Sequence, residues 1–584
     1  MKNNNIVRRL FSYLRPYRAG VAGCLLLVLA ITGLELYRPI IIGDAIDLFI
    51  NEDTVASGSA AANFQGIFRA GMLYLAVLIL LFVCNMAQYW FMQKIGQGVI
   101  YTMRQQIFSH IQSLSMRFFD ITPVGKLVTR VTNDVEALNE MYANIMVRLF
   151  KNVVKILGLA AVMLALNVRM ALFSFLLVPA VVALTLVFQK LSREAYRMAR
   201  NKITALNTFL SENISGMKLI QIFVREKEKL EEFTEKSAEL YRANFREVMV
   251  FAVFRPLIYM VSVLALGIVL YAGGNSLLEG MISIGTLFIF VQYISSFFEP
   301  IQELAEQFST LQSAFASAEK IFTVLDEKPA VVGPEHPVQL PNIKGRIEFR
   351  NVWFAYEKED YILKDVSFTI EPGQKVAFVG ATGAGKSSIL NLIGRYYDIQ
   401  KGQILIDGVD IRKLDISLLR SAIGQVQQDV FLFTGDIESN IRLGNEGISE
   451  EKIREASRIV NADRFIRLLP GGYREKVTER GATFSAGQRQ LLSFARTLAY
   501  DPSILVLDEA TANIDTETEQ WIQEALEHLM SGRTTIMVAH RLSTIQHADL
   551  IMVMHKGRIR ESGTHQELLQ QNGIYKKLYE LQLA

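Results

Sequence analysis

The chain has 584 residues, with 61 basic and 58 acidic side chains, so its formal net charge is only +3. A nucleic-acid partner would require a strongly basic domain, and this balance gives no support for one. Apolar residues make up 51% of the chain and charged residues 20%, which is on the high side for a wholly soluble protein. Both cysteines, Cys24 and Cys84, lie in apolar runs, so neither a disulfide framework nor a zinc site is expected. The composition favours a membrane protein that carries a soluble part.

The first 300 residues contain long uncharged runs that can cross a bilayer as helices, because about 20 apolar residues span its hydrocarbon core. Four runs are long enough alone, and two shorter ones reach spanning length when they are extended past a charge. We therefore expect a multi-domain protein whose transmembrane domain covers residues 1–325. Its six helices are predicted at roughly 19–50, 66–93, 145–168, 170–190, 250–278 and 280–305.

Basic residues predict the orientation, since Lys and Arg concentrate on the cytoplasmic side of membrane proteins. Lys2, Arg8, Arg9, Arg15 and Arg18 precede the first span and place the N-terminus in the cytoplasm. An even number of spans returns the C-terminal half there, which predicts a multi-pass protein of the cell membrane. A cleaved signal peptide is the alternative, but no cleavage site directly follows the first run and the sequence continues apolar.

Two cytoplasmic segments, 94–144 and 190–248, are too long for simple turns. Apolar residues recur in them at helical spacing, so we interpret them as cytoplasmic extensions of the spanning helices. Their tips are expected at 118–125 and 212–216. They are either solvated hairpins or the points where the membrane domain contacts a motor domain, and the motifs described next favour the second interpretation.

A linker at 326–344 leads to a soluble domain at 345–584 that contains a phosphate loop. The β-rich run 375–379 is followed by Gly380-Ala-Thr-Gly-Ala-Gly-Lys-Ser387 and then by helix-like sequence, which is the context that this motif requires. Glycines let backbone N–H groups point at phosphate oxygens. Lys386 is expected to reach the β- and γ-phosphates, and the Ser387 hydroxyl to coordinate Mg²⁺. The residues predicted to hold the nucleotide phosphates are Gly380, Thr382, Gly383, Ala384, Gly385, Lys386, Ser387 and Ser388.

Two further strands predict the rest of a phosphoryl-transfer site. The buried run 504–507 ends in Asp508-Glu509, where one carboxylate can hold Mg²⁺ through water and the next can act as general base. The strand 534–538 brings His540 to the same edge of the sheet. The predicted catalytic residues are therefore Glu509, His540 and Lys386.

Between the phosphate loop and the strand 504–507 stands Phe484-Ser-Ala-Gly-Gln488, followed by the helical stretch 489–498. With this set of motifs, nearly the whole chain resembles an ATP-binding cassette (ABC) exporter half-transporter. The resemblance implies a six-helix transmembrane domain fused to an α/β P-loop nucleotide-binding domain. It also implies an ATP hydrolase coupled to transport, with ATP and Mg²⁺ as cofactors and a second half-transporter as partner.

The resemblance assigns roles to matching positions, although Tyr356, Gln428 and His540 taken singly would be ordinary structural residues. Tyr356 would stack on adenine. Gln428 would meet both Mg²⁺ and the membrane-domain contact, which gives Ser387, Gln428 and Asp508 as the metal ligands. Residues 478–481 would form the short loop that senses movement of the cytoplasmic tips. Residues 512–515, which include Asp515, would form the loop that crosses to the ATPase domain of the partner. Ser485, Gly487 and Gln488 would contact the nucleotide of the opposite subunit.

The signature motif departs from the usual Leu-Ser-Gly-Gly-Gln at two positions, because Phe484 replaces Leu and Ala486 replaces Gly. A Cβ at a glycine position can obstruct close approach and costs about 1 kcal/mol or more where φ is positive. Neutral drift is the simple alternative. The combination of intact catalytic residues with an altered signature resembles one subunit of the heterodimeric bacterial multidrug exporters, so a heterodimer is predicted.

We expect ATP-driven export of amphipathic or multidrug compounds, with membrane lipids and a small-molecule substrate as partners. The alternatives are a lipid or peptide exporter or flippase, a homodimeric transporter, and a regulatory membrane ATPase that does not transport. The six spans exclude a soluble DNA-associated cassette ATPase. An importer is disfavoured because importers usually keep their membrane and ATPase parts on separate chains.

The sequence does not identify the substrate, but charges at membrane depth are functional candidates. Glu35 and Arg38 are one turn apart, and the simplest hypothesis is that they pair with each other. Glu299, Glu303 and Glu306 share one helical face. That face is either a solvated stripe or an acidic vestibule that concentrates cationic compounds.

Overall fold

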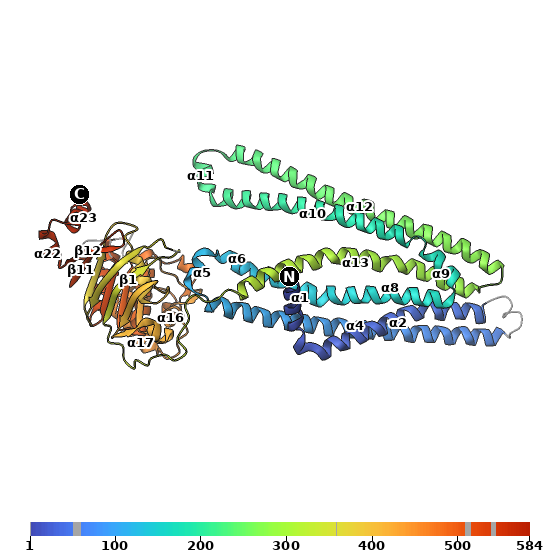
Figure 1. Cartoon of the computed structure of the whole chain (residues 1–584), viewed down its shortest axis with the longest axis horizontal. Coiled ribbons are helices and arrows are strands. Elements are labelled where there is room, and N and C mark those ends of the chain that lie inside the picture. Colours follow the sequence, from blue (N-terminus) through green and yellow to red (C-terminus); the bar gives the residue numbers. More distant parts are fainter. Residues whose placement is uncertain (1, 51–59, 358, 509–515, 539–544, 584) are drawn as a thin grey trace. The chain divides into compact units, whose positions relative to one another are not determined.

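The computed structural model describes residues 2–50, 60–357, 359–508, 516–538 and 545–583. Contacts divide the chain into two units, each described here by itself (Figure 1). The membrane unit comprises Met1–Gln112 and Val124–Glu327, and the ATPase unit comprises Ser113–Pro123 and Lys328–Ala584.

Among the residues that the structure describes, six helices of the membrane unit are long and apolar enough to cross a bilayer, which confirms the predicted number. The elements of this half of the chain are α1 Lys2–Tyr13, a 3₁₀ turn Arg15–Tyr17, α2 Arg18–Phe49, α4 Ala60–Ser113, α5 Met116–Ile121, α6 Val124–Thr129, a π-helical turn Arg130–Asp134, α7 Val135–Glu140, a second π-helical turn Met141–Ile145, α8 Met146–Leu166, α9 Val168–Phe175, α10 Val178–Ser215, α11 Met217–Ile222, α12 Glu226–Leu278 and α13 Ile284–Leu325.

The helices run far beyond the apolar segments, in agreement with the cytoplasmic extensions that the sequence predicts. Helix α4 has 54 residues and is therefore about 80 Å long, more than twice the hydrocarbon thickness. Helices α10 and α12 pack against each other, and α11 joins their ends (Figure 1).

Short polar caps make the turns between spans. Asn167 ends α8 in an extended conformation, and its side-chain oxygen accepts from Met170 N at 3.0 Å, so the same residue starts α9. Ser283 caps α13 in the same way through Thr286 N at 3.1 Å. A cap of this kind satisfies a helix N–H that would otherwise lie unpaired near the membrane.

The ATPase unit contains a mostly parallel sheet with the order β12-β11-β3-β10-β9-β6, formed by Arg558–Gly563, Leu550–His555, Lys375–Val379, Thr534–Val538, Ile504–Asp508 and Ile423–Val426. An antiparallel sheet has the order β2-β1-β4-β5, formed by Leu363–Ile370, Ile347–Phe354, Lys401–Ile406 and Val409–Asp410. A small pair joins β7 Gly435–Asp436 to β8 Lys476–Val477. The helices are α14 Lys386–Ile393, α15 Ile416–Ser421, α16 Ile437–Arg442, α17 Glu450–Ile459, α18 Ala462–Ile466, α19 Ala486–Tyr500, α20 Thr516–Met530, α22 His565–Gln570 and α23 Ile574–Leu583, with 3₁₀ turns at Ile411–Lys413, Gly472–Arg474 and Glu479–Gly481.

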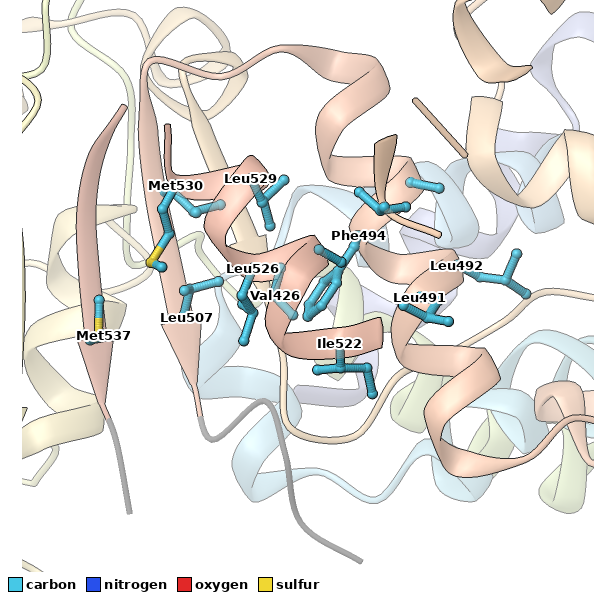
Figure 2. Close-up of a cluster of buried hydrophobic side chains, with 14 of the residues drawn as sticks. Val426, Leu491, Leu492, Phe494, Leu507, Ile522, Leu526, Leu529, Met530 and Met537 are labelled. Carbon is cyan, nitrogen blue, oxygen red and sulfur yellow. The ribbon is translucent and has the colours of Figure 1, made fainter. Parts of the chain in front are cut away.

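Helices α19 and α20 hold one face of the parallel sheet in place. Figure 2 shows Phe494 of α19 and Leu526 of α20 directed toward the strand residues Val426 and Leu507. All four side chains are at most 4% exposed, so the strands that carry the site are fixed by dense apolar packing.

Candidate ATP site and membrane cavity

Three neighbouring strands of the parallel sheet end at one edge. In the register, Val538 of β10 lies beside Phe378 of β3 on one side and Asp508 of β9 on the other. The predicted strands 375–379 and 534–538 are confirmed, and the predicted strand 504–507 extends to Asp508. Glu509, Asp515 and His540 lie outside the described residues. The strand ends that precede Glu509 and His540 are adjacent.

The phosphate loop has the backbone that its glycines were expected to allow. Gly385 has φ +102° and begins α14, and a Cβ there would lie 2.7 Å from Leu363 Cδ2. A Cβ on Gly380 would lie 2.3 Å from the carbonyl oxygen of Met554. Only glycine fits both places, because a side chain would be strained at the first and would clash at both.

A pocket of about 260 Å³ opens at the loop. Its lining brings together seven of the eight predicted phosphate ligands, all but Gly380, with Ile362 and Val538, and consists of Ile362, Thr382, Gly383, Ala384, Gly385, Lys386, Ser387, Ser388 and Val538. The Lys386 side chain is buried, and its Nζ donates to Gly380 O at 2.6 Å and to Ala381 O at 3.2 Å. These bonds fix the ammonium at the loop, while Ser387 is exposed at the start of α14. A helix N-terminus with a fixed cation suits a phosphate chain.

Tyr356 is half-buried and is tied to the helix that follows the loop. Its hydroxyl lies 3.2 Å from Ser388 Oγ and accepts from Asn391 Nδ2 at 3.3 Å. Its ring meets those of Phe354 and Tyr397 edge-on, at centroid distances of 4.8 and 4.9 Å. Stacking of Tyr356 on adenine stays a prediction.

Three predicted Mg²⁺ ligands come from adjacent elements. Asp508 is half-buried at the end of β9, and Ser387 follows β3 through the loop. Gln428 is exposed two residues after β6, whose last residue pairs with Leu507. A hydroxyl, a carboxylate and an amide oxygen form an all-oxygen donor set, which fits Mg²⁺. Among the described residues no cluster of three or more His, Cys, Asp or Glu side chains could hold a metal.

The altered signature starts α19 without backbone strain. Ser485 and Gln488 form a capping box, in which Ser485 Oγ accepts from Gln488 N at 3.2 Å and Ser485 N donates to Gln488 Oε1 at 3.0 Å. Ala486 is the first helical residue, is exposed and does not have positive φ. The strain considered for this position is therefore absent, because the first residue of a helix has ordinary helical dihedrals. Phe484 is buried against Phe465, so its ring replaces Leu as a core side chain, while Gly487 is buried.

The first cytoplasmic tip packs with the ATPase unit. Residues Ser113–Pro123 belong to that unit by contact, and α5 within them ends at Ile121 before Thr122 and Pro123. The Tyr397 hydroxyl donates to the Asp120 carboxylate. Burial of the ring and this bond raise the pKa of Tyr397 above its ordinary value. Tyr397 belongs to no sequence motif and was not predicted as a functional residue.

The second tip remains with the membrane unit and carries exposed apolar residues. Ile214 on α10, Leu219 on α11 and Phe223 after it are 66%, 61% and 65% exposed. The second tip is thus an apolar cluster of Ile214, Leu219 and Phe223. No apolar side chain of the described membrane unit covers it.

The membrane unit encloses a cavity of about 740 Å³ between α2, α8 and α13, with Tyr74 of α4 at its edge. Its lining is mainly polar and consists of Glu35, Leu36, Arg38, Pro39, Ile42, Tyr74, Arg148, Lys151, Asn152, Lys155, Leu159, Gln292, Tyr293, Ser296, Glu299, Pro300 and Glu303. Most of these residues were not predicted as functional, since they come from helices far apart in the chain.

The charged residues of the first span, Glu35 and Arg38, do not pair with each other. Glu35 pairs with Lys151 at 2.9 Å, and Arg38 Nη2 donates to the Tyr74 hydroxyl at 2.7 Å, so the expected Glu35–Arg38 pair is wrong.

The acidic face is engaged rather than free. Glu299 pairs with Lys155 at 3.4 Å, and Glu306 pairs with Arg255 at 3.8 Å. Glu303 accepts a hydrogen bond from Asn152 Nδ2 at 2.9 Å.

A six-helix membrane unit joined to a P-loop ATPase unit defines a membrane transporter driven by ATP. The sequence profile described as the ABC transporter transmembrane region matches residues 21–301, and the profile described as ABC transporter matches residues 363–512. The chain belongs to the ABC transporter family and is an exporter half-transporter, a multi-pass membrane protein with a cytoplasmic ATPase domain.

Individual relatives cover almost the whole chain. The "Probable multidrug resistance ABC transporter ATP-binding/permease protein YheH" of Bacillus subtilis is 41% identical over 89% of this chain and 77% of its own length. The "ATP-dependent lipid A-core flippase" of Desulfotalea psychrophila is 33% identical over 100% of both chains. A solved structure of a bacterial Atm1-family ABC exporter with ATP bound has a TM-score of 0.81 at 27% identity, over 97% of this chain and 98% of the other.

Proposed function

We propose that this chain is the catalytically intact subunit of a heterodimeric ABC exporter that moves amphipathic compounds out of the cytoplasm. The observation that carries the proposal is the combination of an intact phosphate loop and carboxylate pair with Ala486 in the signature. In a head-to-tail dimer, each ATP site combines the phosphate loop of one chain with the signature of the other. A homodimer would therefore place the altered signature over both sites.

The structure limits what Ala486 can do. Because Ala486 is exposed and unstrained, its Cβ does not disturb this chain's own fold. Its effect falls on a nucleotide that approaches α19 from a partner. In a homodimer the altered signature would complete the very sites whose carboxylates are intact. A partner with a normal signature and a defective carboxylate avoids this combination: the site built on this chain would hydrolyse ATP, and the other would mainly hold it.

The residues of this chain have distinct roles in the proposed mechanism. The loop N–H groups and Lys386 bind and orient the phosphates. Ser387, Gln428 and Asp508 would hold Mg²⁺, which supplies charge neutralisation when bound. Glu509 accepts a proton from the attacking water, and His540, two positions after the last residue of β10, fixes the geometry.

Two cytoplasmic tips transmit closure to the membrane helices. The first tip is bonded to the ATPase unit through Asp120. The exposed apolar second tip supports contact with the partner's ATPase unit, since an uncovered apolar cluster is typical of an interaction site. When the ATPase units close, both tips are pulled, and the helices turn from inward- to outward-facing.

The substrate is proposed to be amphipathic because relatives with similar coverage carry the names of a multidrug transporter and a lipid A-core flippase. Both kinds of compound partition into bilayers. A lipid flippase is the alternative within this proposal.

Transport by inside-out vesicles tests the function. Vesicles that contain this chain with a neighbouring half-transporter should accumulate an amphipathic dye with ATP and not without it. Vesicles with Lys386→Ala in this chain are the matched control and should not accumulate dye. Equal uptake by wild type and control would refute ATP-driven export.

A further inference from the structure

The membrane cavity holds charged side chains at a depth in the bilayer where burying a charge costs free energy. Its lining holds four cations, Arg38, Arg148, Lys151 and Lys155, and three carboxylates, Glu35, Glu299 and Glu303, so four minus three leaves a formal charge of +1. From Ile284, where α13 begins, the helix reaches Glu299 after about 20 Å, which is within the bilayer. Ionisable groups at such depth are functional candidates.

All three carboxylates are engaged by side chains of the lining. Glu35 and Glu299 each pair with a lysine, and Glu303 accepts from the Asn152 amide. A cationic substrate would have to displace these contacts. The lining does not offer it a carboxylate without a partner.

Two arginines, in contrast, lack a carboxylate. Arg38 reaches only the Tyr74 hydroxyl and ring, and its Nε is buried without a hydrogen-bond partner among the described residues. A buried unsatisfied donor costs free energy that a ligand acceptor would recover. Arg148 lines the cavity, is exposed, and forms no ion pair or side-chain hydrogen bond with any residue that the structure describes. Guanidinium groups bind carboxylates and phosphates through two parallel bonds.

Polarity changes along the cavity. Helices α2 and α8 leave the cytoplasm in the same direction, so Ile42 and Leu159 lie farther outward than Arg148 and Lys151. On α13, which runs back, Gln292 and Tyr293 are the outermost lining residues and Glu303 is the most cytoplasmic one. On each of the three helices the charged lining residues lie on the cytoplasmic side of Ile42, Leu159 or Tyr293, whereas Leu36 lies on the cytoplasmic side of Arg38.

We propose that this cavity binds an amphipathic anion, whose carboxylate, sulfonate or phosphate group is held by Arg38 and Arg148 and whose apolar body lies against Ile42 and Leu159. The proposal rests on the exporter function above and names its substrate class. The same chemistry occurs in anionic bilayer lipids and in free organic anions.

Binding to the purified full dimer in phosphatidylcholine nanodiscs without ATP tests the proposal. The probes are three fluorescent compounds with one acyl chain and a carboxylate, a trimethylammonium or a neutral alcohol head. Wild type should prefer the carboxylate. Arg148→Gln and Arg38→Gln should each weaken carboxylate binding about 10-fold or more and leave the alcohol unchanged. Arg148→Lys should recover only part of the loss.

Arg169→Gln is the control, because it removes one positive charge from the second residue of α9, which is outside the cavity lining. It should leave binding of all three probes unchanged. Equal weakening of the three probes by the cavity variants, or a wild-type preference for the ammonium head, would overturn the proposal.

The two sources are separated by ATPase stimulation. Arginine-dependent stimulation by phosphatidylglycerol in the nanodisc identifies a lipid source, and stimulation by the free acyl carboxylate identifies a soluble one. The absence of any arginine-dependent response to both overturns the proposal. Head-selective binding without ATP-driven vesicle transport would refute the exporter function alone, whereas dye transport without head-selective binding would refute the anion site alone.

Discussion

The Tyr397 hydroxyl donates a hydrogen bond to the Asp120 carboxylate, across 277 positions of sequence. Asp120 lies in α5, at the first cytoplasmic tip, and Tyr397 packs edge-on against Tyr356 beside the phosphate loop. One side chain thus contacts both the tip and the predicted adenine platform. We infer that it transmits changes at the nucleotide site to the membrane helices.

Replacement of Tyr397 by Phe should uncouple the two parts. The ring contacts remain, but the bond to Asp120 is lost, and such a bond to a charged group contributes about 1.5–3 kcal/mol. We expect substrate-stimulated ATPase activity to fall several-fold. Asp120→Asn should cause a similar fall, and the double variant should add little, because both changes remove one interaction. Full stimulation in both single variants would contradict this role.

Replacement of Glu509 by Gln should leave ATP binding nearly intact and cut hydrolysis about 100-fold or more, the usual scale for loss of a positioned base. The reason is its place directly after Asp508, at the end of β9 beside β10. Single-turnover hydrolysis and equilibrium ATP binding measure the two effects separately. Turnover within twofold of wild type would refute the assignment.

Replacement of Ala486 by Gly should act on the partner's site. The residue is exposed and unstrained, so this chain's stability should change by only about 1 kcal/mol, the helix cost of Gly. We expect ATP residence at the partner's phosphate loop to change more than overall turnover does. Measurement of occluded nucleotide per site checks this. An equal change at both sites would show that the signature does not act across a heterodimer.

Replacement of Glu299, Glu303 and Glu306 together by Gln should not weaken the transport of cationic substrates more than that of neutral ones. Each carboxylate is already engaged by a lysine, an amide or an arginine, so the three do not form a free acidic vestibule. We expect the KM values of cationic and neutral substrates to shift by similar factors. A rise in KM confined to cations would restore the vestibule hypothesis.

Features set by local sequence were predicted well. The loop Gly380–Ser387 needs its glycines where the chain has them, and the strands around it are short apolar runs with few alternatives. The six spans and their cytoplasmic extensions also follow from local hydropathy and periodicity.

Features that depend on packing were not predicted. Helical spacing placed Arg38 near Glu35, but Lys151 on another helix reaches Glu35, and Tyr74 on a third reaches Arg38. The motif showed Ala486 in place of glycine without showing that it begins a helix, where its backbone is ordinary. Tertiary contacts decided the first case, and the local capping box of Ser485 and Gln488 decided the second.

ATPase activity per dimer tests the heterodimer proposal most directly. The chain is purified alone and after co-expression with a neighbouring half-transporter, and both are measured with and without an amphipathic substrate. We predict low, unstimulated activity for the chain alone and full stimulated activity for the pair, which Glu509→Gln in this chain abolishes. Full substrate-stimulated activity of the chain alone would contradict the proposal.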